Sequence, residues 1–218
     1  MKVKDIMTTN VVSITPDTTV LKAAEIMQAH GFERLPVVEK EKLKGIITKD
    51  RLLRASPSQA MPGMNEFVHH LLGKMTISEI METRVITIGP DMPVENAVAL
   101  GQDKKVGCLP VLEHENRGRL LGIVTTNDFF YRILNPLLGI GDSGLRIKVA
   151  NCDDTNKMRK ILDIIMKHEG KILTMSYSRI ADQPEKQLIV HFESGNTDSI
   201  VKDLENSNID VEIREREI

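Results

Sequence analysis

Thr125 and Asp128 lie three residues apart in the segment Gly122–Asp128, where the pattern of a strand gives way to that of a helix. Backbone N–H groups at a helix N-terminus are free to bind phosphate or another anion. The Thr125 hydroxyl can reach such a group, and the Asp128 carboxylate can accept hydrogen bonds from a pair of hydroxyls. The same residues also suit an ordinary helix cap, with Thr125 as N-cap and Asp128 at the third helical position. The sequence is compatible with both interpretations.

These residues belong to an internal repeat. Ile6-Met7, Pro16-Asp17 and Leu35-Pro36-Val37 recur 74 residues later as Ile80-Met81, Pro90-Asp91 and Leu109-Pro110-Val111. A fixed offset through hydrophobic and turn positions indicates a duplicated supersecondary unit. Further along, Gly45 corresponds to Gly122 and Thr48 to Thr125 at an offset of 77, because the second copy has a longer loop.

The two copies differ at the positions that could do chemistry. Arg51 of the first copy stands where the second copy has Asp128, so recognition of paired hydroxyls is predicted for the second copy. Arg34, Lys49 and Arg51 would instead suit phosphate, and the stretch equivalent to Arg34 in the second copy carries no charge. The alternative role for Arg34 is an ion pair with a neighbouring glutamate, Glu33 or Glu39.

Each copy predicts the order strand, helix, strand, strand, helix, from the switch between strand and helix periodicity. In the first copy the expected strands are Val11–Ile14, Leu35–Val38 and Leu43–Ile47, with helices from Val20 to a stop at Gly31 and through Leu52-Leu53. In the second copy they are Val85–Ile88, Leu109–Leu112 and Leu120–Val124, with helices Pro93–Gln102 and from Asn127. A short linker helix is expected over Asn65–Gly73.

Beyond the repeat, Gly139, Gly141 and Gly144 predict a hinge before a separate domain. Its elements alternate in the order strand, helix, strand, strand, helix, strand, which favours a two-layer, ferredoxin-like βαββαβ fold. The expected ranges are Leu145–Val149, Thr155–His168, Lys171–Ser178, Lys186–Phe192, Thr197–Leu204 and Asp210–Arg214.

Composition narrows the possible functions. The chain has 218 residues, 41% of them hydrophobic, and a formal net charge of −2 with both signs interspersed. No basic face for nucleic acid or anionic lipid is expected, nor an apolar stretch of the roughly 20 residues that span a membrane. The N-terminus lacks an apolar signal core. Two cysteines in different segments suit a reducing compartment, so the predicted location is cytoplasmic.

The motifs Met7-Thr8, Pro16-Asp17, Leu35-Pro36-Val37 and Gly45-Ile46-Ile47-Thr48, with their second-copy counterparts, resemble cystathionine β-synthase (CBS) domains. Two such domains in tandem form a Bateman module. The C-terminal part resembles an ACT domain, a small amino-acid-sensing fold, and the order CBS, CBS, ACT is similar to that of acetoin-utilisation-type regulatory proteins. The expected fold class is α/β (α+β), with domains at 1–56 (CBS), 57–75 (linker helix), 76–134 (CBS), 135–144 (Gly-rich hinge) and 145–218 (ACT-like).

The Bateman resemblance implies clefts that bind an adenosyl ligand: ATP, ADP, AMP, S-adenosylmethionine or NAD. On this interpretation Asp128 accepts from two ribose hydroxyls, Thr125 reaches phosphate, and backbone groups beside an apolar slot contact adenine. The nucleotide-binding residues are then Val12, Arg34, Leu35, Pro36, Thr48, Arg51, Val85, Leu109, Pro110, Val111, Thr125 and Asp128. The resemblance also implies a homodimer.

We therefore expect a non-catalytic regulatory sensor without an obligatory cofactor or metal, acting on a downstream protein that the sequence does not name. A homo-oligomeric scaffold with empty clefts and an enzyme of a small-metabolite pathway are the alternatives.

Other candidate sites have simpler explanations. His69 and His70 are adjacent, whereas a helical two-His metal site needs residues four apart. Cys108 has no Cys-His pattern nearby and is expected to pack in a core. In Asn151–Thr155 the glycine common in amino-acid-binding ACT domains is missing, so Asp154 or Thr155 is expected to cap the next helix. Ser194-Gly195-Asn196 is typical of a plain turn.

Overall fold

The computed structural model describes residues 1–55, 73–114, 117–150, 152, 154–179 and 186–216. The chain divides into two compact units, Met1–Phe129 and Phe130–Ile218. The predicted linker helix at Asn65–Gly73, with His69 and His70, lies almost entirely outside the described residues. The two units are each described by themselves below.

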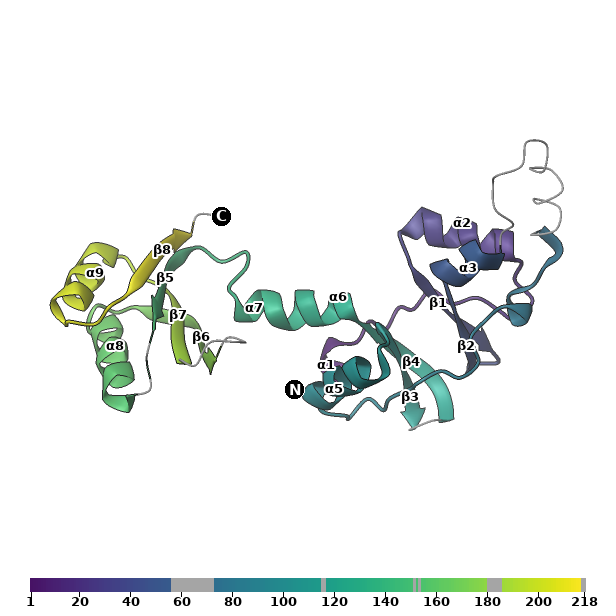
Figure 1. The fold of residues 1–218 in the computed structure, drawn as a ribbon, viewed down its shortest axis with the longest axis horizontal. Coiled ribbons are helices and arrows are strands. Elements are labelled where there is room, and N and C mark those ends of the chain that lie inside the picture. Colours follow the sequence, from purple (N-terminus) through teal and green to yellow (C-terminus); the bar gives the residue numbers. More distant parts are fainter. Residues whose placement is uncertain (56–72, 115–116, 151, 153, 180–185, 217–218) are drawn as a thin grey trace. The chain divides into compact units, whose positions relative to one another are not determined.

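The first unit contains the repeat as two similar halves around one sheet (Figure 1). The first half holds α2 (Val20–His30), β1 (Arg34–Glu39), β2 (Lys42–Thr48) and α3 (Lys49–Ala55). The second half holds α5 (Val94–Lys104), β3 (Cys108–His114), β4 (Arg117–Thr125) and α6 (Thr126–Phe129). The four strands follow the order β1-β2-β4-β3, joined at the centre by pairing of Lys42 with Arg119.

Local sequence signals account for these elements. Thr19 caps α2 by accepting a hydrogen bond from the Lys22 N–H at 3.2 Å, and Gly31 ends the helix in the left-handed conformation with φ of 67°. Apolar residues of α2, β1 and β2 then form one buried cluster. The predicted helix from Val20 to Gly31 and the predicted strand at Leu35-Pro36-Val37 are therefore confirmed.

The N-terminal segments of the two copies are exchanged between the halves. The helix α1 (Val3–Ile6) is tied to the second half, where the Val3 N–H donates to the Met92 carbonyl at 2.9 Å. The 3₁₀ helix η1 (Ile77–Glu79) is tied to the first half, where the Ile77 N–H donates to the Thr18 carbonyl at 2.8 Å. Ile77 is fully buried in the first half's apolar cluster. Each half is thus completed by a segment of the other copy.

The exchange continues as two isolated bridges, Thr8 with Ile123 on β4 and Glu82 with Ile46 on β2. At both places the segment passes directly over a strand glycine. A Cβ on Gly122 would lie 2.7 Å from the Thr8 carbonyl oxygen, and one on Gly45 would lie 2.7 Å from that of Glu82. Only glycine permits this approach.

The predicted strands Val11–Ile14 and Val85–Ile88 are wrong in extent. Each contributes a single parallel bridge, Ile14 with Val37 and Ile88 with Val111. The next ladder donor would come two residues later in a parallel pair. Those positions are Pro16 and Pro90, which have no backbone N–H, so the strands stop after one residue.

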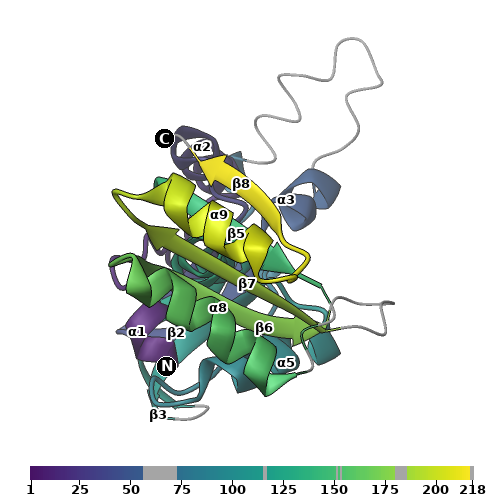
Figure 2. The same cartoon turned by 90° about the vertical axis from the view of Figure 1, so that its left-hand side faces the viewer.

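The second unit is a two-layer α/β fold (Figure 2). It begins with the π-helical η2 (Phe130–Leu134) and α7 (Asn135–Leu137) and continues through β5 (Gly144–Val149), α8 (Thr155–Lys167), β6 (Lys171–Arg179), β7 (Lys186–Glu193), α9 (Thr197–Asn206) and β8 (Glu212–Arg216). The antiparallel sheet has the order β6-β7-β5-β8. This order confirms the predicted ferredoxin-like topology and the α+β fold class.

The predicted Gly-rich hinge, 135–144, is partly fixed by packing against β7. A Cβ on Gly139, whose φ is +61°, would lie 2.1 Å from Nδ1 of His191, and one on Gly144 would lie 2.6 Å from the Phe192 carbonyl oxygen. The glycines here allow the chain to lie close to the sheet. Motion at this hinge stays a prediction.

Replacing Gly122 by alanine should destabilise the first unit. The added methyl would overlap the Thr8 backbone, and such overpacking costs about 1–3 kcal/mol, more than the roughly 0.4–1 kcal/mol that alanine gains from the unfolded chain. Urea unfolding followed by circular dichroism measures the change. Gly89→Ala is the matched control, because a Cβ there meets nothing within 4 Å. Equal stabilities of the two variants would contradict the close approach.

Candidate functional site

Two cavities of the first unit contain the candidate residues. The larger of these two has a volume of about 580 Å³. Its described lining comes from the end of β4 and start of α6, from the start of β1 and β3, and from the exchanged segment at Thr8: Thr8, Gly31, Phe32, Glu33, Arg34, Gly107, Cys108, Ile123, Thr125, Thr126, Asn127 and Asp128. A volume in this range suits a small organic ligand. Residues of both copies therefore build one site.

Asp128 is the central polar residue of this cavity and is only 9% exposed. One carboxylate oxygen, Oδ2, accepts from the Thr125 N–H and from the Thr125 hydroxyl, both at 2.7 Å. The other, Oδ1, accepts from the Thr8 hydroxyl at 3.1 Å. The predicted capping pair is therefore present, and the same bonds fix the carboxylate at the cavity wall.

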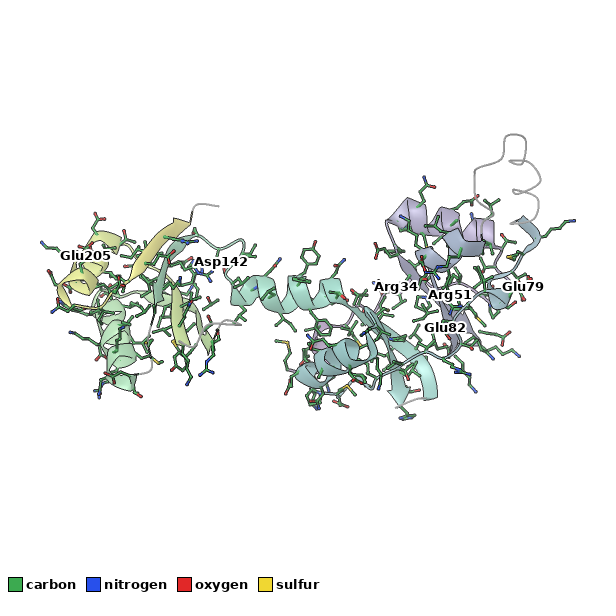
Figure 3. All side chains as sticks on the ribbon, in the orientation of Figure 1. Arg34, Arg51, Glu79, Glu82, Asp142 and Glu205 are labelled. Atoms are coloured by element: carbon green, nitrogen blue, oxygen red, sulfur yellow. The ribbon has the colours of Figure 1, made fainter. Side chains whose placement is uncertain are left out.

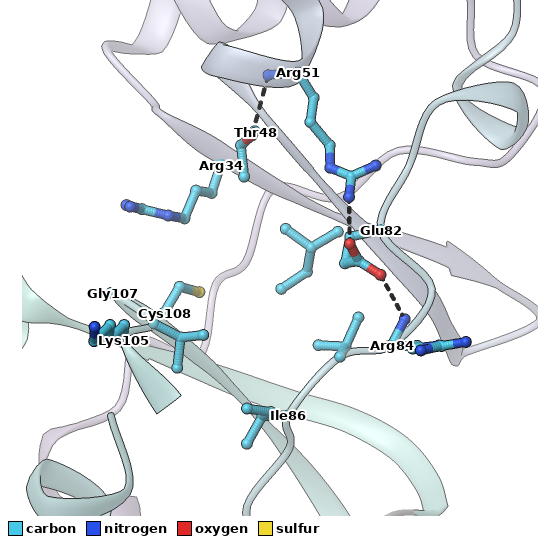
Figure 4. A pocket seen from close by; sticks show the side chains of 12 residues that line it. Arg34, Thr48, Arg51, Glu82, Arg84, Ile86, Lys105, Gly107 and Cys108 are labelled. Atoms are coloured by element: carbon cyan, nitrogen blue, oxygen red, sulfur yellow. Dashed lines mark hydrogen bonds and ion pairs between the residues drawn. The ribbon is translucent and has the colours of Figure 1, made fainter. Parts of the chain in front are cut away.

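The smaller cavity has a volume of about 320 Å³ (Figure 4). It is lined by Arg34, Ile46, Thr48, Arg51, Glu82, Arg84, Val85, Ile86, Lys105, Val106, Gly107 and Cys108. Nine of these residues stand at positions equivalent by the repeat to residues of the larger cavity. Among them, Ile46, Thr48, Arg51 and Glu82 correspond to Ile123, Thr125, Asp128 and Thr8. The two cavities are related by the duplication.

In the smaller cavity Arg51 and Glu82 form an ion pair, the pair drawn together in Figure 4. Arg51 also donates from Nη1 to the Ile80 carbonyl at 3.1 Å, and its backbone N–H donates to the Thr48 hydroxyl at 3.3 Å. Glu82 Oε1 accepts from the Arg84 N–H at 3.0 Å. Arg51 and Glu82 thus occupy the places that Asp128 and Thr8 hold in the larger cavity.

Arg34 lines both cavities, and Figure 3 places it near Arg51 and Glu82. A Cβ on Gly107 would lie 3.2 Å from Arg34 Nη2, so the guanidinium passes directly over the second half. Arg34 Nη1 lies 3.6 Å from Glu33 Oε2, which is one of the two ion pairs expected as its alternative role. Lys49 lies instead with Arg34 and Thr48 at a third cavity of about 280 Å³.

Of the seven predicted apolar contact residues, Val85 alone is among the described lining of the two cavities. The Leu-Pro-Val stretches are buried, and their prolines accept backbone bonds from Ile14 and Ile88 at 3.0 Å each. Val85 lines the smaller cavity, whereas Val12 is exposed. The described lining of these two cavities does not include Val12, Leu35, Pro36, Leu109, Pro110 or Val111. Their contact with adenine stays a prediction.

Sequence reasoning missed Thr8 and Glu82. Each reaches its cavity through the exchange of segments, which local periodicity does not reveal. The signal that could have found them is the repeat itself, because the two residues stand 74 positions apart at equivalent places. A glycine inside a strand, Gly45 or Gly122, was the second signal, because it often marks a close backbone approach.

The remaining candidates behave as ordinary structural residues. Asp154 caps α8 by accepting from the Asn156 N–H at 2.8 Å, as predicted. Ser194 accepts from the Asn196 N–H at 3.1 Å in a turn. Among the described residues, no group of three or more His, Cys, Asp or Glu could hold a metal ion. In the same part of the chain no helix is both long and apolar enough to cross a membrane.

Cys108 is buried at the start of β3, beside both cavities. Burial raises the pKa of its thiol to about 11, because the thiolate would lose its hydration, while the nearby Arg34 acts in the opposite direction. The thiol therefore stays protonated near neutral pH. This agrees with the expected packing role.

Comparison with known proteins finds the same two repeat copies in the chain. The profile of the CBS domain matches residues 3–58 and 77–135. The chain belongs to the CBS domain family. A CBS domain-containing protein of Dictyostelium discoideum is 37% identical over 139 residues, which cover 62% of this chain and 94% of that protein.

Solved CBS structures cover the same region. A protein assigned to acetoin utilization (AcuB) from Vibrio cholerae is 29% identical with a TM-score of 0.53, over 65% of this chain and 95% of that chain. CBSX2, solved in complex with AMP, shares the fold at 24% identity with a TM-score of 0.50, over 62% of this chain and 96% of that chain. The tandem CBS domains expected from the motifs are confirmed.

The raised pKa predicts slow alkylation of Cys108. A rise from 9.0 to about 11 lowers the thiolate fraction near pH 8 about 100-fold, and the thiolate is the reactive form. In a Cys152→Ser variant, iodoacetamide should therefore modify Cys108 at least about 100-fold more slowly in native protein than in urea. Mass spectrometry over time gives both rates. Similar rates in the two conditions would show an accessible thiolate and contradict the burial.

Proposed function

We propose that this CBS protein is a non-catalytic regulator that binds an adenosyl ligand in the larger cavity. The observation that carries the proposal is the buried Asp128 carboxylate, held by Thr125 and Thr8 at the wall of a cavity of about 580 Å³. A carboxylate so fixed can accept from the two hydroxyls of a ribose without first having to be ordered.

The ligand would act by changing the relation between the two halves. The larger cavity is lined by residues of both, including Arg34 of β1 and Asp128 of α6. A ligand that contacts both halves favours one arrangement over another, and a nearly complete reversal needs a preference of about 5.5 kcal/mol. The candidates are ATP, ADP, AMP, S-adenosylmethionine and NAD.

The second unit is proposed to be an ACT-like domain that passes the signal on by association. Its ferredoxin-like topology and its position after two CBS domains support this assignment. The similarity to the Vibrio cholerae protein supports a role linked to acetoin or other small-metabolite use. Two buried, free cysteine thiols support a cytoplasmic location.

Calorimetry with the five candidate ligands at millimolar concentration tests the ligand proposal. At least one should bind, and Asp128→Asn should weaken its binding about tenfold or more, because an amide accepts ribose hydroxyls less strongly than a charged carboxylate. Asp163→Asn, at an exposed position of α8, is the matched control and should bind normally. Heat from none of the five ligands, or equal affinities of the two variants, would refute the proposal.

A homodimer is the proposed assembly. β6 and β8 are the outer strands of the second unit's sheet, and an outer strand can pair with another chain. Light scattering during size-exclusion chromatography should give twice the mass of one chain. A mass of one chain at micromolar concentration would contradict the dimer and leave the ligand site unaffected.

A further inference from the structure

The two cavities carry a carboxylate on opposite elements. In the larger cavity the helix carries Asp128, and the exchanged segment carries Thr8, which donates to it. In the smaller cavity the helix carries Arg51, and the segment carries Glu82 (Figure 4). The carboxylate has thus moved from the helix to the segment, and a guanidinium stands in its former position.

This reversal changes the charge of the cavities. The described lining of the smaller cavity has a single acid, Glu82, against the cations Arg34, Arg51, Arg84 and Lys105. The described lining of the larger cavity has two acids, Glu33 and Asp128, against Arg34. A concave site with a surplus of cations attracts anions, whereas one with a surplus of carboxylates does not.

We propose that the smaller cavity is an anion-selective site, which binds an adenosyl compound through its phosphate, while the larger cavity does not require the phosphate. The inference rests on the proposed function, since both cavities are taken to bind an adenosyl compound. The residues that set the selectivity are Arg51 and Glu82.

Glu82 competes with a ligand phosphate for the Arg51 guanidinium. The Arg84 N–H holds its carboxylate at 3.0 Å, so Glu82 stays in place when its partner moves. The side chains of Arg51 and Glu82 are both 41% exposed, so a ligand in the cavity can reach them. A phosphate monoester carries up to about two negative charges against one on Glu82, and it can bind a guanidinium through two oxygens. A phosphate therefore displaces Glu82 from Arg51, and a neutral nucleoside does not.

AMP and adenosine form a matched pair of probes, since they differ by the phosphate alone. Calorimetry of the full chain should show an AMP-binding event that adenosine lacks. Arg51→Gln should weaken that event about tenfold or more, because a charged contact to phosphate is lost. Glu82→Gln should strengthen it by at least about threefold, because the competing carboxylate is removed. Adenosine binding should change in neither variant.

The opposite directions separate ligand selection from a merely structural ion pair, for which both substitutions would disturb the cavity alike. Arg54→Gln is the matched control, because Arg54 lies on the same helix in an exposed pair with Asp50 and should leave AMP binding unchanged. If Arg51→Gln fails to unfold cooperatively on heating, Glu82→Gln decides alone: stronger AMP binding supports the proposal, and unchanged or weaker binding overturns it.

The two proposals fail differently. Absence of binding by both probes to the wild-type chain would overturn the anion-selective site, and the proposed function would fall with it only if ATP, ADP, S-adenosylmethionine and NAD also gave no heat. Suppose that Asp128→Asn weakens AMP binding, while Arg51→Gln and Glu82→Gln change the AMP affinity in the same direction or leave it unchanged. This result would overturn the anion-selective site alone. The double variant Arg51→Asp with Glu82→Thr recreates the residues of the larger cavity, and it should gain a second adenosine-binding event. A double variant that gains no second adenosine-binding event and still binds AMP in preference to adenosine would also contradict the inference.

Discussion

The close approach of each exchanged segment to a strand glycine is the constraint on which the first unit depends. The Thr8 carbonyl can bridge to Ile123 because Gly122 has no side chain, and Glu82 bridges to Ile46 past Gly45 for the same reason. These bridges bring Thr8 to Asp128 and Glu82 to Arg51. Backbone contacts that belong to the fold therefore position the side chains of both cavities.

Elements set by local signals were predictable from the sequence, and elements set by pairing were not. The helix ending at Gly31 and the βαββαβ order of the second unit follow from periodicity and turn residues. The segments at Ile14 and Ile88 have the composition of strands but form one bridge each. Their limit is the proline two residues later, which has no backbone N–H to continue the ladder.

The same distinction applies to the candidate site. Thr125, Asp128, Thr48 and Arg51 were found because each lies where a strand ends and a helix begins, a position that can be recognised along the chain. Their partners Thr8 and Glu82 come from the opposite copy, so no local pattern connects them. The difference in charge between the cavities is visible only after these partners are in place.

The exchange of segments has a consequence for the history of the chain. A single copy on its own would lack the apolar side chain at Ile77, which the other copy supplies to its core. Two separate copies could each provide that segment to the other, as in a domain-swapped pair. The arrangement within this chain is thus what results when two such partners are fused end to end. Fusion also lets the two sites diverge, because a residue such as Arg51 can then change in one copy without changing in the other.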